Sequence, residues 1–207
     1  MLEAGRGVPV AGAGDCMGRS IGATGLRPYH PDIHTPVCGR AVTVRTRPGD
    51  NLIIHKALLR AEPGDVVVID AGGSTEQAIV GGLMRTTALA RKLGGFVIDG
   101  AVRDLAEWDE GGMACFARGH THRGPAKDGP GAVNIPISCG GLVVMPGDLL
   151  LADADGIIAI PVAELPSLMP KVQAHLVKEE NIRQTNAREK GDSERIDTLL
   201  RSKGVMV

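Results

Sequence analysis

The chain has 207 residues, a formal net charge of -1 at pH 7 and only 2% aromatic residues. The near-neutral charge excludes a broad basic surface for nucleic acid, and no apolar stretch reaches the roughly 20 residues that a membrane-spanning helix needs. The length and the 43% hydrophobic content predict one compact domain over residues 1–207, with a core of Val, Ile, Leu and Ala.

The first 36 residues are rich in Gly and Pro, so we expect loops there with one short helix near residues 15–20. The stretch from Gly12 to Gly18 resembles a nucleotide-binding loop, but it follows a poor strand containing Pro9 and lacks the spaced acidic residue of such loops. Cys16 has no identifiable base beside it, which favours an inert thiol. The four scattered cysteines contain no C-x-x-C pair and no signal-peptide pattern precedes them, so we expect a cytoplasmic protein.

Regular elements are predicted from Gly39 onward. Residues 39–46 alternate like a strand, residues 51–61 have helical spacing after a cap at Asp50 or Asn51, and residues 65–70 form a short buried strand. Residues 71–93 are first glycine-rich and then helical, and residues 95–99 form another apolar strand. Together they predict a central βαβ unit with parallel strands and a right-handed crossover.

The carboxyl ends of parallel strands meet at one edge of a sheet, so the glycine turn after Asp70 and the turn after Ile98 should converge there. The helix between them has two possible starts. Ser74 with Gln77 fits a capping box, whereas a start at Gly81 and Gly82 would direct free backbone N–H groups toward the same edge.

The last third of the chain contains short strands and then a helix. Residues 113–119, 132–137, 142–145, 148–152 and 157–160 predict an antiparallel or barrel-like sheet, which makes the fold class α/β. Residues 162–207 are highly charged, with Val172 and Leu176 in helical spacing, and predict a C-terminal helical extension. So narrow an apolar stripe is typical of a solvated face, and the alternative is that the helix lies against another subunit. We expect loose order after Gly191.

Two histidine pairs, His120 with His122 and His30 with His34, suggest a metal site only weakly. Pro31 separates the second pair, and a zinc site needs three or four converging ligands. A structural or solvent-exposed role is favoured for both pairs.

Arg103 and Asp104 follow the strand at residues 95–99 and have two interpretations. Asp104 can cap the next helix while Arg103 pairs with a nearby carboxylate. Alternatively, the planar fork of Arg103 binds a substrate carboxylate and Asp104 supplies a hard oxygen for a divalent cation.

The second interpretation is favoured by a family resemblance. Gly82, twenty further residues, and then the run from Arg103 to Glu107 resemble the signature of the class II pyruvate aldolases typified by 4-hydroxy-4-methyl-2-oxoglutarate / 4-carboxy-4-hydroxy-2-oxoadipate aldolase. The stretches VIDGAVRD, FARGHTHRGPAKDGPGAVNIPI and GGLVVMPGD also resemble family blocks, and the likeness extends from about Val8 to Glu180. The same family contains the regulators of ribonuclease E activity.

The resemblance implies a fold related to the swivelling β/β/α domains, a Mg²⁺ or Mn²⁺ cofactor, and a homotrimer or dimer of trimers. It implies that Arg103 binds the carboxylate of a pyruvyl substrate, that Asp104 ligates the metal, and that backbone amides around Gly81, Gly82, Leu83 and Met84 complete the carboxylate pocket. It also places a carboxylate from a neighbouring subunit near the metal, for which Glu179 is the matching position, with Glu180 adjacent.

The implied activity is metal-dependent cleavage of 4-hydroxy-2-oxo acids to pyruvate, with oxaloacetate decarboxylation as a second activity. One departure affects this expectation, because many relatives carry an acidic residue where this chain has Gly82. The alternative is a non-catalytic protein that inhibits a ribonuclease by protein–protein binding. The physiological substrate is open at this point.

Overall fold

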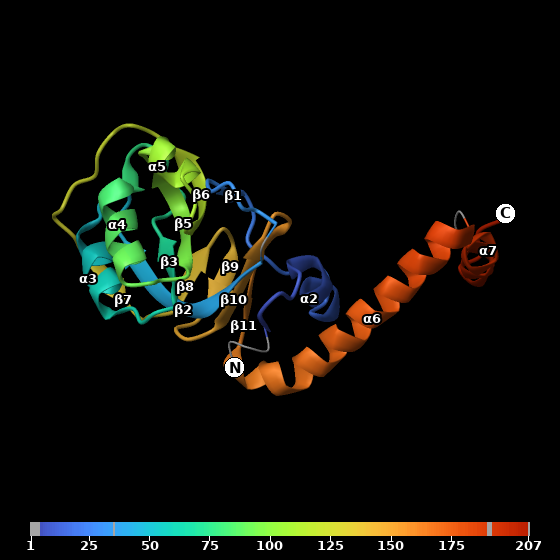
Figure 1. Cartoon of the computed structure of the whole chain (residues 1–207). Helices are drawn as coiled ribbons and strands as arrows, with labels where there is room; N and C mark the ends of the chain where they lie inside the picture. Colours follow the sequence, from blue (N-terminus) through green and yellow to red (C-terminus); the bar gives the residue numbers. More distant parts are fainter. Residues whose placement is uncertain (1–4, 35, 190–191, 207) are drawn as a thin grey trace. The chain divides into compact units, whose positions relative to one another are not determined.

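The computed structural model describes residues 5–34, 36–189 and 192–206. The chain divides into two compact units, Met1–Met169 and Pro170–Val207. The first unit contains all of the strands described below and the helices that pack on them, as Figure 1 shows. The second unit is helical.

The main sheet has nine strands, and its central path runs in the order β1-β6-β5-β3-β2-β10-β11. Strands β2, β3, β5 and β6 are parallel neighbours, whereas β10 is antiparallel to both β2 and β11. Two short strands lie off this path, β4 beside β5 and β7 beside β2, and β8 and β9 form a separate two-stranded sheet. The strand bounds are β1 Arg27–Pro28, β2 Val37–Thr46, β3 Val66–Asp70, β4 Ala78–Val80, β5 Gly95–Val102, β6 Ala114–His120, β7 Gly131–Val133, β8 Ile137–Cys139, β9 Leu142–Val144, β10 Leu149–Asp153 and β11 Gly156–Ile160.

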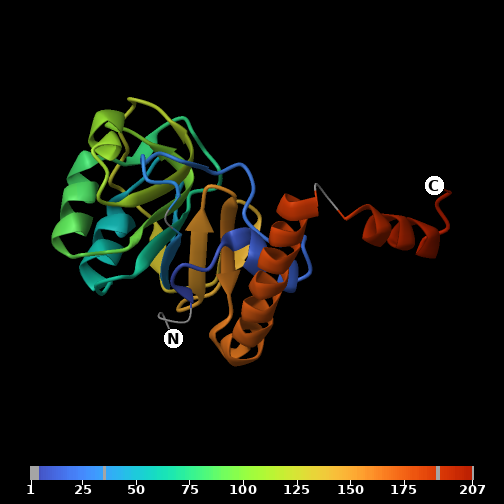
Figure 2. The same ribbon diagram turned by 45° about the vertical axis from the view of Figure 1, so that its right-hand side comes forward.

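Each face of the sheet carries its own hydrophobic core. Helices α3 (Leu52–Arg60), α4 (Gly82–Ala90) and α5 (Leu105–Asp109) cover one face, where Leu58, Met84 and Trp108 are buried (Figure 1). The hairpin β8–β9 lies on the other face, as the turned view in Figure 2 also shows, with Ile137 and Val144 in the second core. Because β3 is buried on both faces, it is the continuous apolar run expected of a central parallel strand.

The structure confirms the mixed α/β fold and the central βαβ unit, because β3 and β5 pair in parallel with α4 between them in sequence. Of the strands expected to form an antiparallel or barrel-like sheet, β7 to β11 pair antiparallel, whereas β6 pairs in parallel with β5 and antiparallel with β1. Two expectations for single elements are wrong. The short N-terminal helix, α2, spans Val10–Cys16 and not residues 15–20. Residues after Gly191 include a regular helix, α7 (Ser193–Ser202), whose first turn is capped by the Asp192 side chain.

The C-terminal helix is as long and polar as its sequence indicates. It begins with the 3₁₀ turn η1 (Val162–Glu164), and α6 (Leu165–Glu189) continues it across the boundary between the two units. No helix in the described part of the chain combines the length and apolar character that crossing a membrane requires.

Candidate functional site

The start of helix α4 lies beside the end of strand β5. Strand β4 pairs with the last residues of β5, and the Arg103 backbone N–H donates to the Val80 carbonyl at 3.1 Å. Gly81 is the N-cap of α4, so of the two predicted starts the one at Gly81 and Gly82 is correct and the one at Ser74 is wrong. This geometry places both glycines next to Arg103 and Asp104.

The glycine turn after Asp70 meets the stretch after Ile98 as predicted, but that stretch is strand and not a turn. Strand β5 does not end near Ile98 but continues to Val102, because Ala101 and Val102 pair with β4. The glycine turn after Asp70 therefore lies beside the middle of β5, where the Gly73 N–H donates to the Asp99 carbonyl at 3.0 Å. The partner of Arg103 is the turn at Gly81.

Asp104 connects α4 and α5. Its backbone has φ 61° and ψ 49°, a left-handed conformation that residues other than Gly, Asn and Asp rarely adopt. Its side chain makes no capping hydrogen bond to α5, although Asp104 directly precedes that helix. Instead, its Oδ2 accepts a hydrogen bond from the Gly82 N–H at 2.8 Å, at the positive end of the α4 dipole. The carboxylate is therefore held toward α4, in a strained backbone position of the kind found at functional sites.

Arg103 lies against the same carboxylate, with its Nε 3.5 Å from Asp104 Oδ2. The two side chains are about 38% and 39% exposed, so they are accessible to a ligand. The Trp108 Nε1–H group donates to the Arg103 carbonyl at 2.9 Å, which ties buried Trp108 in α5 to the site backbone. The guanidinium is thus presented from a fixed backbone.

The two glycines leave room for the charged side chains. A Cβ atom on Gly81 would lie 2.5 Å from Asp104 Oδ2 and 2.9 Å from Arg103 Cγ. A Cβ atom on Gly82 would overlap the carboxylate of Glu107, which lies directly against this glycine. Glu107 thus fills the space into which a side chain at position 82 would extend.

The backbone amides at this helix start are partly engaged within the chain. The Gly82 N–H donates to Asp104, and the Met84 N–H donates to the Gly81 carbonyl at 3.0 Å. Met84 is buried in the core, whereas the Leu83 side chain is 82% exposed at the mouth of the site. The structure brings Arg103, Asp104 and the two glycines together.

The residues present fit a divalent cation. Asp104 and Glu107 both contact Gly82 and supply carboxylate oxygens, the ligand type that Mg²⁺ prefers. The hydrogen bond from Gly82 and the contact with Arg103 both involve Oδ2 of Asp104. The side chain is also partly exposed, which leaves space for an ion that keeps several of its water ligands.

Glu179 lies in the second unit. Within α6 its Oε1 is 3.4 Å from His175 Nε2, one helical turn away. The adjacent Glu180 accepts a hydrogen bond from Gln184 at 2.9 Å.

A cavity of about 240 Å³ adjoins Arg103. Its lining includes Gly81, Leu83 and Met84, and it adds Asn51, His55 and Lys127 from α3 and from the loop between β6 and β7. Sequence reasoning did not single out these last three residues as site residues, because they lie in different segments of the chain and meet only in three dimensions. Burial and the neighbouring charge of Lys127 lower the pKa of His55, so its imidazole is neutral at neutral pH.

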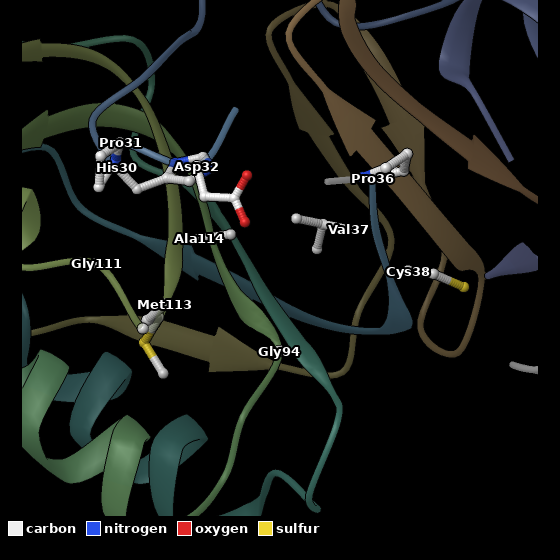
Figure 3. Close-up of a pocket in the computed structure, with 11 residues that line it drawn as sticks. His30, Pro31, Asp32, Pro36, Val37, Cys38, Gly94, Gly111, Met113 and Ala114 are labelled. Atoms are coloured by element: carbon white, nitrogen blue, oxygen red, sulfur yellow. The ribbon is translucent and has the colours of Figure 1, made fainter. Parts of the chain in front are cut away.

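A second cavity, of about 360 Å³, lies at the opposite ends of the strands, near the starts of β2 and β6. Figure 3 shows the Asp32 carboxylate pointing into this space, between His30 and Val37. His30 is buried, and its Nδ1 accepts a hydrogen bond from the Cys115 N–H at 3.1 Å, which agrees with the structural role expected for it. None of the predicted site residues lines this cavity.

Comparisons with known proteins identify the family and agree with the fold. The family model described as RraA-like, Aldolase/RraA, matches residues 10–159. A Thermus thermophilus protein named 4-hydroxy-4-methyl-2-oxoglutarate aldolase is 37% identical over 59% of this chain and 74% of its own length. A Halalkalibacterium halodurans protein named "Putative 4-hydroxy-4-methyl-2-oxoglutarate aldolase" is 42% identical over 66% of this chain. The match spans 65% of that protein, slightly under two thirds of its length.

A solved structure shares the architecture over most of both chains. It is Streptomyces coelicolor RraAS2, described as an unusual member of the RNase ES inhibitor RraA protein family, with 26% identity and a TM-score of 0.80 over 88% of this chain and 94% of that one. The family model covers most of the chain and the fold agrees with it, so the chain belongs to the RraA-like, Aldolase/RraA family.

Proposed function

We propose that this protein is a divalent-metal-dependent lyase that cleaves 4-hydroxy-2-oxo acids, of the 4-hydroxy-4-methyl-2-oxoglutarate type, to pyruvate. The observation that supports this most strongly is the hydrogen bond between the Gly82 N–H and Asp104, which holds a carboxylate and the neighbouring Arg103 fork at one helix start. The aldolase names of two relatives support the same reaction class.

Each charged side chain has a distinct role in this proposal. Arg103 binds the 1-carboxylate of the substrate through two parallel N–H donors. Asp104 would hold Mg²⁺ or Mn²⁺, the kind of ion that keeps several of its waters. When bound, the ion supplies Lewis-acid polarisation of the 2-oxo group.

Bond cleavage requires a base for the C4 hydroxyl. As the C3–C4 bond breaks, its electron pair passes to C3 of the pyruvyl fragment, and the C4 hydroxyl loses its proton to become a carbonyl. Glu107 lies where an acidic side chain at position 82 would lie, so it compensates for Gly82 and accepts this proton through a water molecule. Loss of carbon dioxide from oxaloacetate leaves the same electron pair on C3, so decarboxylation is the expected second activity.

The proposed assembly is a homotrimer or a dimer of trimers. In it, the C-terminal extension at residues 162–207 packs on a neighbouring subunit, and Glu179 of that extension serves the neighbour's site. The polar character of α6 and the partly exposed Glu179 are compatible with this arrangement.

A substrate panel tests the proposed reaction. Pyruvate release from 4-hydroxy-4-methyl-2-oxoglutarate and from oxaloacetate should require Mg²⁺ and stop with a chelator. Arg103→Lys keeps the charge but loses the fork, so the KM should rise about tenfold or more while the melting temperature stays unchanged. An unchanged KM would contradict the role of Arg103.

The ribonuclease alternative is supported by the description of the Streptomyces coelicolor neighbour. If purified protein with Mg²⁺ releases no pyruvate from either compound but slows RNA cleavage by a ribonuclease of the E type, the lyase proposal is wrong.

A further inference from the structure

The cavity of about 360 Å³ near the starts of β2 and β6 is large enough to hold a small molecule. Much of its wall is apolar, with side chains of Val37, Met113 and Ala114. Among the described residues that line it, Asp32 supplies a carboxylate and there is no Lys or Arg. Such a lining favours a ligand with an apolar body and a positively charged group.

His30 supplies a buried hydrogen-bond donor at this cavity. The residue is only 8% exposed, and its Nδ1 accepts from the Cys115 backbone N–H at 3.1 Å. A neutral imidazole that accepts at Nδ1 carries its proton on Nε2. The Cys115 carbonyl also lies 3.1 Å from Nδ1, but it already accepts from the Tyr29 N–H at 2.8 Å and does not need a proton from His30. The Nε2–H group is therefore a donor.

This donor has no acceptor within residues 5–34, 36–189 and 192–206. The ring of Phe116 packs against the imidazole in a T-shaped arrangement, with 5.0 Å between the ring centroids, and carries no acceptor atom. Buried N–H groups in folded proteins are nearly always paired. Because His30 lines the cavity, an oxygen acceptor on a ligand there would complete the pairing.

Asp32 places a carboxylate at the same cavity, two residues along the chain from His30. Figure 3 shows this carboxylate pointing into the space, and the residue is exposed. An ionised carboxylate forms its strongest hydrogen bonds with charged donors such as an ammonium group. A ligand that uses both residues therefore combines an ammonium group with an oxygen acceptor on an apolar body, which is the chemistry of an apolar amino acid.

We propose that this cavity binds an apolar amino acid, whose ammonium group pairs with Asp32 and whose carboxylate accepts a hydrogen bond from His30 Nε2–H. The side chain of the amino acid lies against the apolar wall formed by Val37 and Met113. The site is separate from Arg103 and Asp104, and it does not depend on the lyase reaction proposed above.

Hydrogen bonds connect the cavity wall to Trp108, the single tryptophan of the chain. Gly111, which lines the cavity, donates its N–H to the Trp108 carbonyl at 3.1 Å. The carbonyl of Gly111 accepts from Nη2 of the buried Arg85 side chain at 2.8 Å. A ligand that contacts Gly111 should therefore change the intrinsic fluorescence of Trp108.

The binding test compares L-leucine with two probes that each lack one group. The amine 3-methylbutan-1-amine lacks the oxygen acceptor, and 4-methylpentanoate lacks the ammonium group. In fluorescence titrations of the wild type at neutral pH, confirmed by calorimetry, L-leucine should bind about tenfold or more tightly than either probe. Absence of L-leucine binding, or equal affinity for all three compounds, would overturn the proposal.

Asp32→Asn tests the ammonium contact. The substitution removes the charge from an exposed side chain, so the affinity for L-leucine should fall about tenfold or more. Asp109→Asn is the matched control, because Asp109 is an exposed carboxylate next to Trp108 that lies outside the cavity lining, and it should leave the affinity unchanged. Equal affinities in the two variants would remove Asp32 from the site.

His30→Asn tests the oxygen contact. Asparagine Oδ1 is as far along the side chain as Nδ1 and can still accept from the Cys115 N–H, but the variant lacks the Nε2–H donor. It should bind L-leucine about tenfold more weakly and 3-methylbutan-1-amine as the wild type does. Equal losses for the two compounds would overturn the role of His30. If this variant does not fold, the wild-type comparison of L-leucine with the amine still decides the contact.

Discussion

Asp50 shows how a single buried carboxylate organises the loop that carries Lys127. Its side chain is fully buried and accepts hydrogen bonds from the backbone N–H groups of Leu52, Asp128 and Gly129. Burial raises the pKa of this carboxyl, but the three N–H donors and the charge of Arg47 outweigh burial and lower the pKa below its usual 3.8.

Because the folded-state pKa of Asp50 is lowered, its contribution to stability is fully present above the unfolded-state value near 3.8 and is lost as the pH falls through the lowered value. Asp50→Asn should reduce the free energy of unfolding by about 2–4 kcal/mol at pH 7. In urea titrations the difference between wild type and variant should shrink below pH 3.8. A difference that grows on acidification would contradict the assigned pKa direction.

Gly82 is a second residue whose effect can be isolated. Gly82→Ala improves helix propensity but forces the Glu107 carboxylate away from its place, so kcat/KM for pyruvate release should fall about tenfold or more without loss of fold. The matched control is Gly14→Ala in α2, where a Cβ would meet nothing within 4 Å. Equal activities of the two variants would show that the position of Glu107 is unimportant.

At the scale of elements, α5 couples the core to the site. The single tryptophan, Trp108, is buried against Phe96 and donates to the Arg103 carbonyl. Ligand binding at Arg103 should therefore change the intrinsic fluorescence. We expect a saturable change when oxalate is added with Mg²⁺, and a much weaker response in Arg103→Lys. A wild-type signal unaffected by oxalate at saturating concentrations would contradict the coupling.

Elements with strong periodicity were predictable from the sequence, and those decided by tertiary pairing were not. Strand β3 and helix α3 follow from an apolar run and from helical spacing near a cap. The extension of β5 to Val102 depends on pairing with three-residue β4, which is too short to carry a pattern of its own. The parallel direction of β6 is likewise set by its neighbour β5.

The same distinction applies to the candidate site. Arg103, Asp104 and the glycine pair could be identified because their spacing in the sequence resembles the signature of a known family. Asn51, His55 and Lys127 could not, because they reach the cavity from α3 and from a loop anchored by Asp50. The left-handed backbone of Asp104 has no mark in the sequence either.

At the scale of the whole molecule, the proposed assembly requires each site to combine residues from two chains. Asp104→Asn and Glu179→Gln should each be inactive alone as homo-oligomers. Mixed after dissociation and reassembly, they should regain part of the activity, because some sites then receive Asp104 from one chain and Glu179 from the other. Glu180→Gln is the neighbouring control and should remain active.

Light scattering should give a trimer or hexamer mass for the wild type. A monomer, or a mixture that stays inactive, would contradict a site shared between subunits.

Pyruvate release from 4-hydroxy-4-methyl-2-oxoglutarate by wild type and Asp104→Asn, each titrated with Mg²⁺, is the most direct test of the proposed metal-dependent lyase. Asparagine tolerates the left-handed backbone at this position and keeps the side-chain shape, so the variant should fold normally. We predict Mg²⁺-dependent release by the wild type and a loss of about a hundredfold or more in the variant. Equal rates in the two proteins, or release by the wild type that does not depend on metal, would contradict the assignment of Asp104 as the metal ligand.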